Sequence, residues 1–135
     1  MEKLEYMDSL LTELKEALST VDDELVNRLA EAILEAPRVF VSGSGRSGLS
    51  IREFAMRLMH MGISVYVLGE VVTPGLKAGD LLIIASGSGE TGGQVVVAKK
   101  AKELGGKIGL VTIAPGSAID AVADFPVYIN APATK

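Results

Sequence analysis

The sequence predicts an α/β fold, a three-layer α/β/α sandwich with about five parallel strands that follow two N-terminal helices. Three observations predict this class. Short apolar runs alternate with helical stretches after Pro37, two of these runs end in the same seven-residue glycine pattern, and residues 1–36 place apolar side chains at helical spacing. We therefore expect a single domain over residues 1–135, with a helical N-terminal segment (1–36) and an α/β core (37–135).

The first helix is predicted by an apolar seam near the N-terminus. Its apolar residues recur at alternating steps of three and four, which gives a narrow stripe typical of packing on another helix. The seam can cover this chain's own domain or contact a second copy, and both remain open at this point. The seam consists of Leu4, Met7, Leu11, Leu14 and Leu18.

A second helix follows, for which Ser19 or Thr20 is the expected cap. Leu25, Leu29 and Ile33 fall along one of its faces. It must end near residue 36, because a residue that precedes proline is disfavoured in the helical conformation.

The core is predicted to alternate strands with helices. Continuous apolar strands of this kind are typical of a parallel sheet covered on both faces. A proline at position 126 places the last strand at a sheet edge, since proline donates no ladder hydrogen bond. The expected strands are 38–41, 64–68, 81–85, 107–113 and 125–130. The expected helices are one that carries apolar residues from Leu49 to Met59 and is ended by Gly62, one over 92–104, and a short one from the cap Ser117 to Ala123.

The pattern Ser-Gly-Ser-Gly-x-(Ser/Thr)-Gly occurs at residues 42–48 and again at 86–92. Each copy follows an expected strand and precedes an expected helix. Glycine permits sharp turns, and a helix start offers unpaired N–H groups and a positive dipole end that favour an anion. Since ligands of such sheets bind beyond the carboxyl ends of the strands, the two copies predict one site for a small phosphorylated ligand.

Two other interpretations of these loops stay open. Both can be plain turns in which Ser47 and Thr91 cap helices, and Thr91 begins a capping-box pattern with Gln94. The first copy also spells the dinucleotide fingerprint G-x-G-x-x-G, with Glu70 at about the 20-residue interval expected for a ribose-binding acid. Three observations argue against dinucleotide binding. The pattern is repeated after another strand, where a dinucleotide fold does not need it, the loops are rich in hydroxyls, and the chain leaves no room for a substrate domain.

Composition narrows the function classes. The chain has 48% hydrophobic residues and a mean hydropathy of +0.36, which supports a real core. It has no cysteine and one histidine, so disulfides and thiolate or histidine-rich metal sites are not expected. A net charge of −4 gives no nucleic-acid footprint, and no apolar run predicts a membrane span. With no secretory pattern, a cytoplasmic protein is expected.

Three stretches resemble the sugar isomerase (SIS) domain family, and within it the 6-phospho-3-hexuloisomerase branch. They are residues 42–48 with Phe54–His60, residues 65–74 with Gly-Glu-x-x-Thr-Pro, and residues 86–91 with Ala98–Lys102. The resemblance covers essentially the whole chain. It implies a SIS-like, flavodoxin-like sheet, interconversion of 3-hexulose 6-phosphate and fructose 6-phosphate, no metal or organic cofactor, and a homodimer or homotetramer with sites shared between subunits.

The resemblance also implies site residues. Ser47, Ser86, Ser88 and Thr91 would hold the phosphate, and His60 would lie near a subunit-shared active site. The expected phosphate- and sugar-binding set in the two loops is Ser44, Gly45, Arg46, Ser47, Ser86, Gly87, Ser88, Gly89 and Thr91.

Moving a carbonyl between adjacent carbons needs a base and a group that shuttles the oxygen-bound proton. His60 and Glu70 are the catalytic candidates, and Glu90 is a further carboxylate, although a first-turn acid at a helix start is its simpler interpretation. Members of the branch that the chain resembles continue into a segment carrying a catalytic glutamate, which has no counterpart here. We therefore expect an isomerase with impaired catalysis, with a non-catalytic sugar-phosphate-binding module and a dinucleotide-binding domain as alternatives.

Overall fold

A computed structural model describes residues 4–132. Its centre is a five-stranded, fully parallel sheet of order β2-β1-β3-β4-β5, which confirms the predicted fold class. The strands are β1 (Val39–Gly43), β2 (Val65–Val67), β3 (Leu81–Ala85), β4 (Lys107–Thr112) and β5 (Phe125–Tyr128). The helices are α1 (Met7–Ser19), α2 (Asp23–Glu35), α3 (Gly45–His60), α4 (Gly92–Glu103) and the short 3₁₀ helix η1 (Asp120–Val122).

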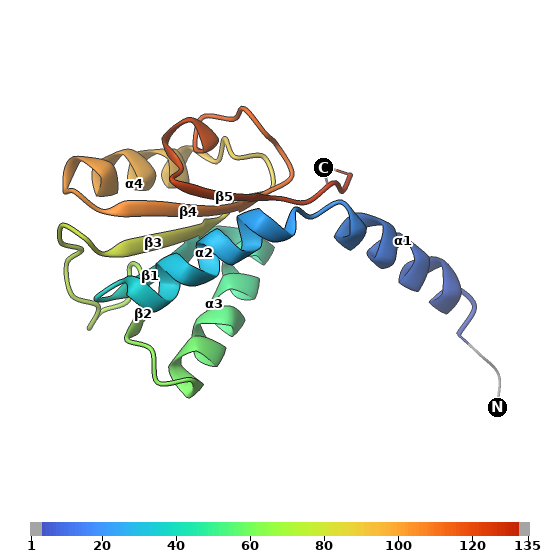
Figure 1. The fold of residues 1–135 in the computed structure, drawn as a ribbon, viewed down its shortest axis with the longest axis horizontal. Helices are drawn as coiled ribbons and strands as arrows, with labels where there is room; N and C mark the ends of the chain where they lie inside the picture. The colour runs from blue at the N-terminus through green and yellow to red at the C-terminus, as the bar shows by residue number, and fades with distance from the viewer. Residues whose placement is uncertain (1–3, 133–135) are drawn as a thin grey trace.

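The sheet lies between two helical layers (Figure 1). Helices α2 and α3 cover one face, and α4 with η1 covers the other. Side chains alternate along the strands between the two faces: Val39 and Val41 pack with the first layer, whereas Phe40 packs with the second. Because both faces are covered, all three of these side chains are fully buried.

Strand order positions the two glycine patterns. Strand β1 pairs directly with β3, and Gly43 lies opposite Ala85 at their carboxyl ends. The chain therefore leaves both strands at neighbouring points on the same edge of the sheet. The expectation that the two patterns lie side by side is confirmed. The expected edge position of the last strand is also confirmed, because β5 ends the strand order.

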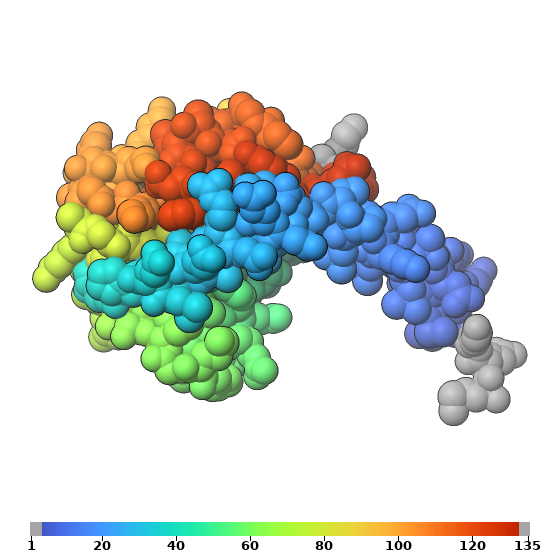
Figure 2. All heavy atoms as spheres, viewed as in Figure 1, coloured from blue at the N-terminus to red at the C-terminus, as the bar shows by residue number. Residues whose placement is uncertain are grey.

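Helix α1 points away from the rest of the molecule (Figures 1 and 2). None of its residues is buried, and Leu11, Leu14 and Leu18 of the apolar seam are each about 60% exposed. The seam therefore does not cover this chain's own domain, which was one of its two interpretations.

The cap of α2 differs from the expected one. Asp22 caps this helix by accepting a hydrogen bond from the Glu24 N–H at 2.8 Å. The Thr20 hydroxyl instead donates to the Ala17 carbonyl and accepts from the Asn130 N–H, and the Ser19 hydroxyl donates to Glu16. Ser19, Thr20 and Asp22 are all residue types that cap helices, and the local sequence alone does not show which of them forms the cap.

Two further expectations need correction. Helix α3 begins at Gly45, inside the glycine pattern, whereas the helix was expected to follow the pattern. The last helix shrinks to the three residues of η1, and Ile119 precedes it in place of the expected cap Ser117. Within residues 4–132, every helix is too short or too polar to cross a membrane.

An ion pair holds the amino edge of the sheet, opposite the glycine patterns. Arg38 Nη2 lies 2.6 Å from Asp80 Oδ2, and Asp80 also accepts from the Lys77 N–H at 2.8 Å. Burial raises the pKa of the Asp80 carboxyl, but the hydrogen bonds from Arg38 and Lys77 outweigh it, so the net pKa is lowered. Asp80 is therefore an ionised, structural carboxylate at the edge away from the candidate site.

Candidate functional site

The candidate site consists of a first loop (residues 42–48) and a second loop (residues 86–92) at the carboxyl edge of the sheet. Ser44 immediately precedes α3, and Thr91 immediately precedes α4. Neither side chain makes a capping hydrogen bond, so the capping-box interpretation of Thr91 is wrong. Two helix starts whose first-turn N–H groups lack a side-chain cap therefore lie at one edge, and both favour an anion.

The second loop is braced by its own side chains. Ser86 is buried, and its Oγ accepts a hydrogen bond from the Gly89 N–H at 3.0 Å. The Ser86 and Thr91 hydroxyl oxygens lie 3.2 Å apart and share a further hydrogen bond. The exposed Ser88 accepts from the Glu90 N–H at 3.1 Å, so its hydroxyl hydrogen remains available as a donor.

The turn after β4 supports the second loop from outside. Thr112 Oγ1 donates to the Gly87 carbonyl at 3.1 Å, and the Ile119 N–H donates to the Gly89 carbonyl at 3.0 Å. The Glu90 carboxylate accepts a hydrogen bond from the Ala118 N–H. Because α4 begins only at Gly92, Glu90 is a tie between two loops and not a first-turn acid.

Gly89 is the tightest point of this support. Its φ is +64°, a left-handed conformation that glycine adopts without strain. A Cβ built on it would lie 1.9 Å from the Ser117 Oγ. Ser117 is the one described residue with a buried polar side-chain atom that has no hydrogen-bond partner. Ser117 was expected to cap a helix, so this contact with Gly89 was not predicted from the sequence.

The first loop is held by a side chain from α4. Ser42 Oγ donates to Gln94 Oε1 at 2.7 Å, and Gln94 Nε2 donates to Ser44 Oγ at 3.1 Å. Gln94 is 8% exposed and shares the buried face of α4 with Ala98 and Ala101. From the sequence, Gln94 was expected only as the capping partner of Thr91. The sequence did carry a signal for this role: Gln94 is a polar residue at the helical spacing of the buried residues Ala98 and Ala101.

The remaining residues of the first loop lie at the start of α3. Arg46 is exposed in the first helical turn, and Ser47 is half-buried beside it. Gly48 is needed for close approach, because a Cβ there would lie 2.6 Å from the Gly43 carbonyl oxygen. This close packing of helix on strand is also what a dinucleotide loop requires, so the geometry of the first loop alone does not separate the two ligands.

The two catalytic candidates lie at different edges of the sheet. Glu70 follows β2 at the carboxyl edge, where its carboxylate forms a half-exposed ion pair with Arg52 at 2.8 Å. His60 is the last residue of α3, and Gly45 is the first. At a rise of about 1.5 Å per residue these two residues are roughly 22 Å apart, so His60 is remote from the loops of its own chain.

The described residues contain no group of three His, Asp or Glu side chains arranged to hold a metal ion. The donors at the carboxyl edge are hydroxyls and backbone N–H groups, together with the exposed Arg46. This donor set suits an anionic oxygen ligand such as a phosphate ester.

Comparison with known proteins identifies the family. The SIS domain model matches residues 32–135. The chain is 45% identical over 125 residues to 3-hexulose-6-phosphate isomerase of Bacillus subtilis, covering 93% of this chain and 68% of that protein. It is 48% identical over 119 residues to 3-hexulose-6-phosphate isomerase of Mycobacterium gastri, covering 88% of this chain and 60% of that protein. The chain thus spans roughly two thirds of the length of these relatives.

Solved structures with a similar fold support the same family. A crystal structure of a hypothetical protein superposes with a TM-score of 0.90 at 38% identity, covering 96% of this chain and 69% of that one. A protein from Methanococcus jannaschii, whose crystal structure infers a function of 3-hexulose-6-phosphate isomerase, gives a TM-score of 0.84 at 35% identity, with coverages of 98% and 76%. The chain belongs to the SIS domain family, in which it is similar to 3-hexulose-6-phosphate isomerases.

Proposed function

We propose that residues 1–135 form one sugar-phosphate-binding domain of the 6-phospho-3-hexuloisomerase type, whose reaction converts 3-hexulose 6-phosphate to fructose 6-phosphate. The observation that carries the proposal is the pairing of β1 with β3, which brings two glycine loops and two helix starts to one edge. The names of the similar proteins support the choice of reaction. A cytoplasmic location stays a prediction.

The donors at this edge are sufficient for useful affinity. A hydrogen bond to a charged group contributes roughly 1.5–3 kcal/mol, and a micromolar complex needs about 8 kcal/mol after ordering costs. The Ser88 hydroxyl and the first-turn N–H groups of α3 and α4 are candidate donors, and Thr91 can add another. Four or five such bonds would reach the micromolar range, provided that the two loops bind the same phosphate or sugar.

For turnover, Glu70 is the proposed base, because it is the catalytic candidate at the same edge as the loops. His60 can contribute only from a second copy, given its distance along α3. Removal of this base should cost about 10²–10⁴-fold in rate, as is typical for a general base. A non-catalytic sugar-phosphate-binding module is the alternative.

Calorimetric titration tests the binding function. Fructose 6-phosphate should bind saturably to the wild-type chain, whereas unphosphorylated fructose and NAD should not. The double variant Ser88→Ala/Thr91→Val should bind fructose 6-phosphate more weakly. Val96→Ala, a substitution at an exposed position of α4, is the matched control and should bind it as the wild type does. Equal binding of fructose, or saturable binding of NAD, would overturn the proposal. A coupled assay of fructose 6-phosphate formation, with Glu70→Gln beside the wild type, then separates enzyme from binding module.

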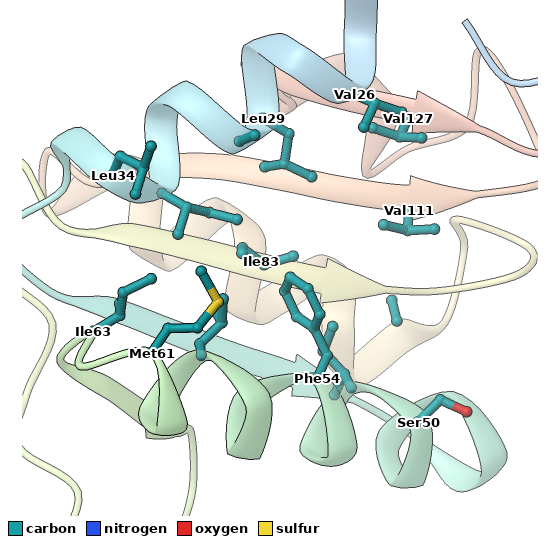
Figure 3. Close-up of a pocket in the computed structure, with 15 residues that line it drawn as sticks. Val26, Leu29, Leu34, Ser50, Phe54, Met61, Ile63, Ile83, Val111 and Val127 are labelled. Carbon is teal, nitrogen blue, oxygen red and sulfur yellow. The ribbon is translucent and has the colours of Figure 1, made fainter. Parts of the chain in front are cut away.

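We further propose that the chain forms homo-oligomers through α1 and an apolar groove. The groove, with a volume of about 560 Å³, runs between α2 and α3 over the sheet, and Ser50 is the one polar residue in its lining (Figure 3). The exposed seam of α1 is apolar as well. The net charges of the two helices are also opposite. Helix α1 carries three acids and one lysine, whereas α3 carries three arginines and one glutamate, and one of these arginines, Arg52, already pairs with Glu70.

The absence of cysteine from the sequence allows a direct test of this interface. Leu11→Cys in α1 and Phe54→Cys in the groove, placed on separate chains and mixed, should form a disulfide-linked heterodimer. Leu11→Cys mixed with Val71→Cys, a fully exposed position outside the groove, is the control. A monomer in sedimentation at high micromolar concentration, or a heterodimer that forms no faster than in the Val71→Cys control, would overturn the interface.

A further inference from the structure

We propose that Gln94 is a positioning residue of this site: its amide holds the first loop against α4 and directs the Ser44 hydroxyl hydrogen toward the ligand. The inference rests on the proposed function, because the ligand it concerns is the sugar phosphate. Gln94 is not itself a binding residue in this view. It acts through Ser44.

The direction of the hydrogen bonds carries the inference. A serine hydroxyl has one hydrogen to donate and two lone pairs to accept with. Ser42 donates its hydrogen to Gln94 Oε1, at 2.7 Å, so that hydrogen is used within the protein. Ser44 instead accepts from Gln94 Nε2, at 3.1 Å, and its own hydrogen remains free. The same amide therefore uses one serine as a donor and leaves the other as a donor for an anion.

The position of Ser44 fits this role. It is exposed at the start of α3, and its side chain does not cap that helix. Its hydroxyl hydrogen thus lies beside first-turn N–H groups that favour the same anion. A phosphate oxygen accepts hydrogen bonds and donates none when fully ionised, so an orientation that presents hydrogen and not lone pairs is the productive one.

Burial makes the bridge effective. Gln94 is 8% exposed, and hydrogen bonds in such surroundings are stronger than in water. Its partner Ser44 is 50 residues away in the sequence, whereas Thr91 of the second loop is only three residues before it. Gln94 is therefore placed to fix the spacing between a donor of the first loop and the donors of the second.

A thermodynamic cycle on the full chain tests the inference. Gln94→Met keeps an unbranched side chain of similar length but has no amide, and Ser44→Ala removes the oriented hydroxyl. Each should weaken fructose 6-phosphate binding by about 10–100-fold, the loss expected for one hydrogen bond to a charged group. The double variant should lose at least fivefold less than the product of the two single losses, because both changes remove the same donor. Val96→Met, on the exposed face of α4, is the matched control.

Amide hydrogen exchange of the ligand-free protein provides a second readout. Gln94→Met should speed exchange in residues 43–47 and leave the second loop unchanged. Independent losses in the cycle, or Gln94→Met with wild-type affinity and exchange, would overturn the role of Gln94 while the binding function stands. A wild-type chain that binds no fructose 6-phosphate would overturn the proposed function and this role together.

Discussion

The two glycine loops have nearly the same sequence but are held in different ways. Gly45 and Gly89 occupy the same position of the pattern and adopt similar left-handed conformations, with φ values of +55° and +64°. Around Gly89 the loop is packed and bonded to its own serine and to the turn after β4. Around Gly45 nothing lies within 4 Å of a Cβ built on the residue. The repeated pattern therefore encodes backbone shape, and the surrounding structure supplies the support.

Because of this difference, we expect the two loops to contribute differently to stability and to ligand binding. The second loop is a braced half, whose Ser86 hydroxyl is already used inside the protein. The first loop is an open half, tied to the molecule through the Gln94 amide. Substitution of the bracing residue Ser86 should mainly cost stability, and substitution of Ser44 in the first loop should mainly cost affinity.

Alanine at the two equivalent glycines should give the largest contrast. Gly89→Ala combines left-handed strain with a clash against Ser117 and should destabilise the fold by about 2–4 kcal/mol. Gly45→Ala carries the strain alone and should cost about 1–2 kcal/mol. Urea unfolding measures both. Gly89→Ala/Ser117→Gly should recover part of the loss, and equal effects at the two glycines would contradict the difference in support.

Serine substitutions separate stability from affinity. Ser86→Ala leaves a buried Gly89 N–H without its acceptor and should destabilise the fold by about 1–3 kcal/mol. Ser44→Ala removes the acceptor of Gln94 Nε2, but at an exposed position where water can replace it. It should therefore cost less stability than Ser86→Ala, below about 1 kcal/mol, while weakening fructose 6-phosphate binding. Thermal unfolding beside calorimetric titration measures both properties. If Ser44→Ala destabilises as much as Ser86→Ala, the first loop is not the open half.

The ion pair at the amino edge shows whether stability alone controls binding. The pKa of Asp80 is lowered in the folded state, so its contribution to stability is present above its unfolded pKa and is lost as pH falls through the lower folded value. Asp80→Asn should reduce the melting temperature at pH 7, with a gap to the wild type that narrows in acid. Its affinity for fructose 6-phosphate at 20 °C and pH 7 should equal that of the wild type. A matching fall in affinity would mean that the loops respond to stability in general.

The smallest effect concerns Tyr128, beside the support of the second loop. Burial, together with the 2.7 Å hydrogen bond to Asp120, raises the pKa of Tyr128 to about 12. Its contribution is therefore present below the unfolded pKa of about 10 and is lost as pH rises through about 12. Tyr128→Phe should be slightly less stable than the wild type at pH 8, and the difference should vanish near pH 12. A constant difference across this range would show that the hydroxyl is not the cause.

Much of this architecture could be predicted from the sequence. The strand runs, the edge position of β5 and the adjacency of the loops follow from apolar patterning and glycine placement, which act locally. The side-chain partners could not be predicted in the same way. Gln94 has the local pattern of a capping box, yet its partners Ser42 and Ser44 lie about 50 residues earlier. Ser117 likewise precedes a short helix, but its hydroxyl packs on Gly89 from a distant strand connection. Only the packing of α4 and of the turn after β4 determines these contacts.

The central claim is that both loops bind one ligand. An NMR titration of the ¹⁵N-labelled chain with fructose 6-phosphate tests it most directly, because each loop has backbone amides that report separately. If both loops contact the same sugar phosphate, the amides of residues 44–48 and of residues 87–92 should shift together and fit a single dissociation constant. Shifts confined to one loop, or two different dissociation constants for the two loops, would contradict it.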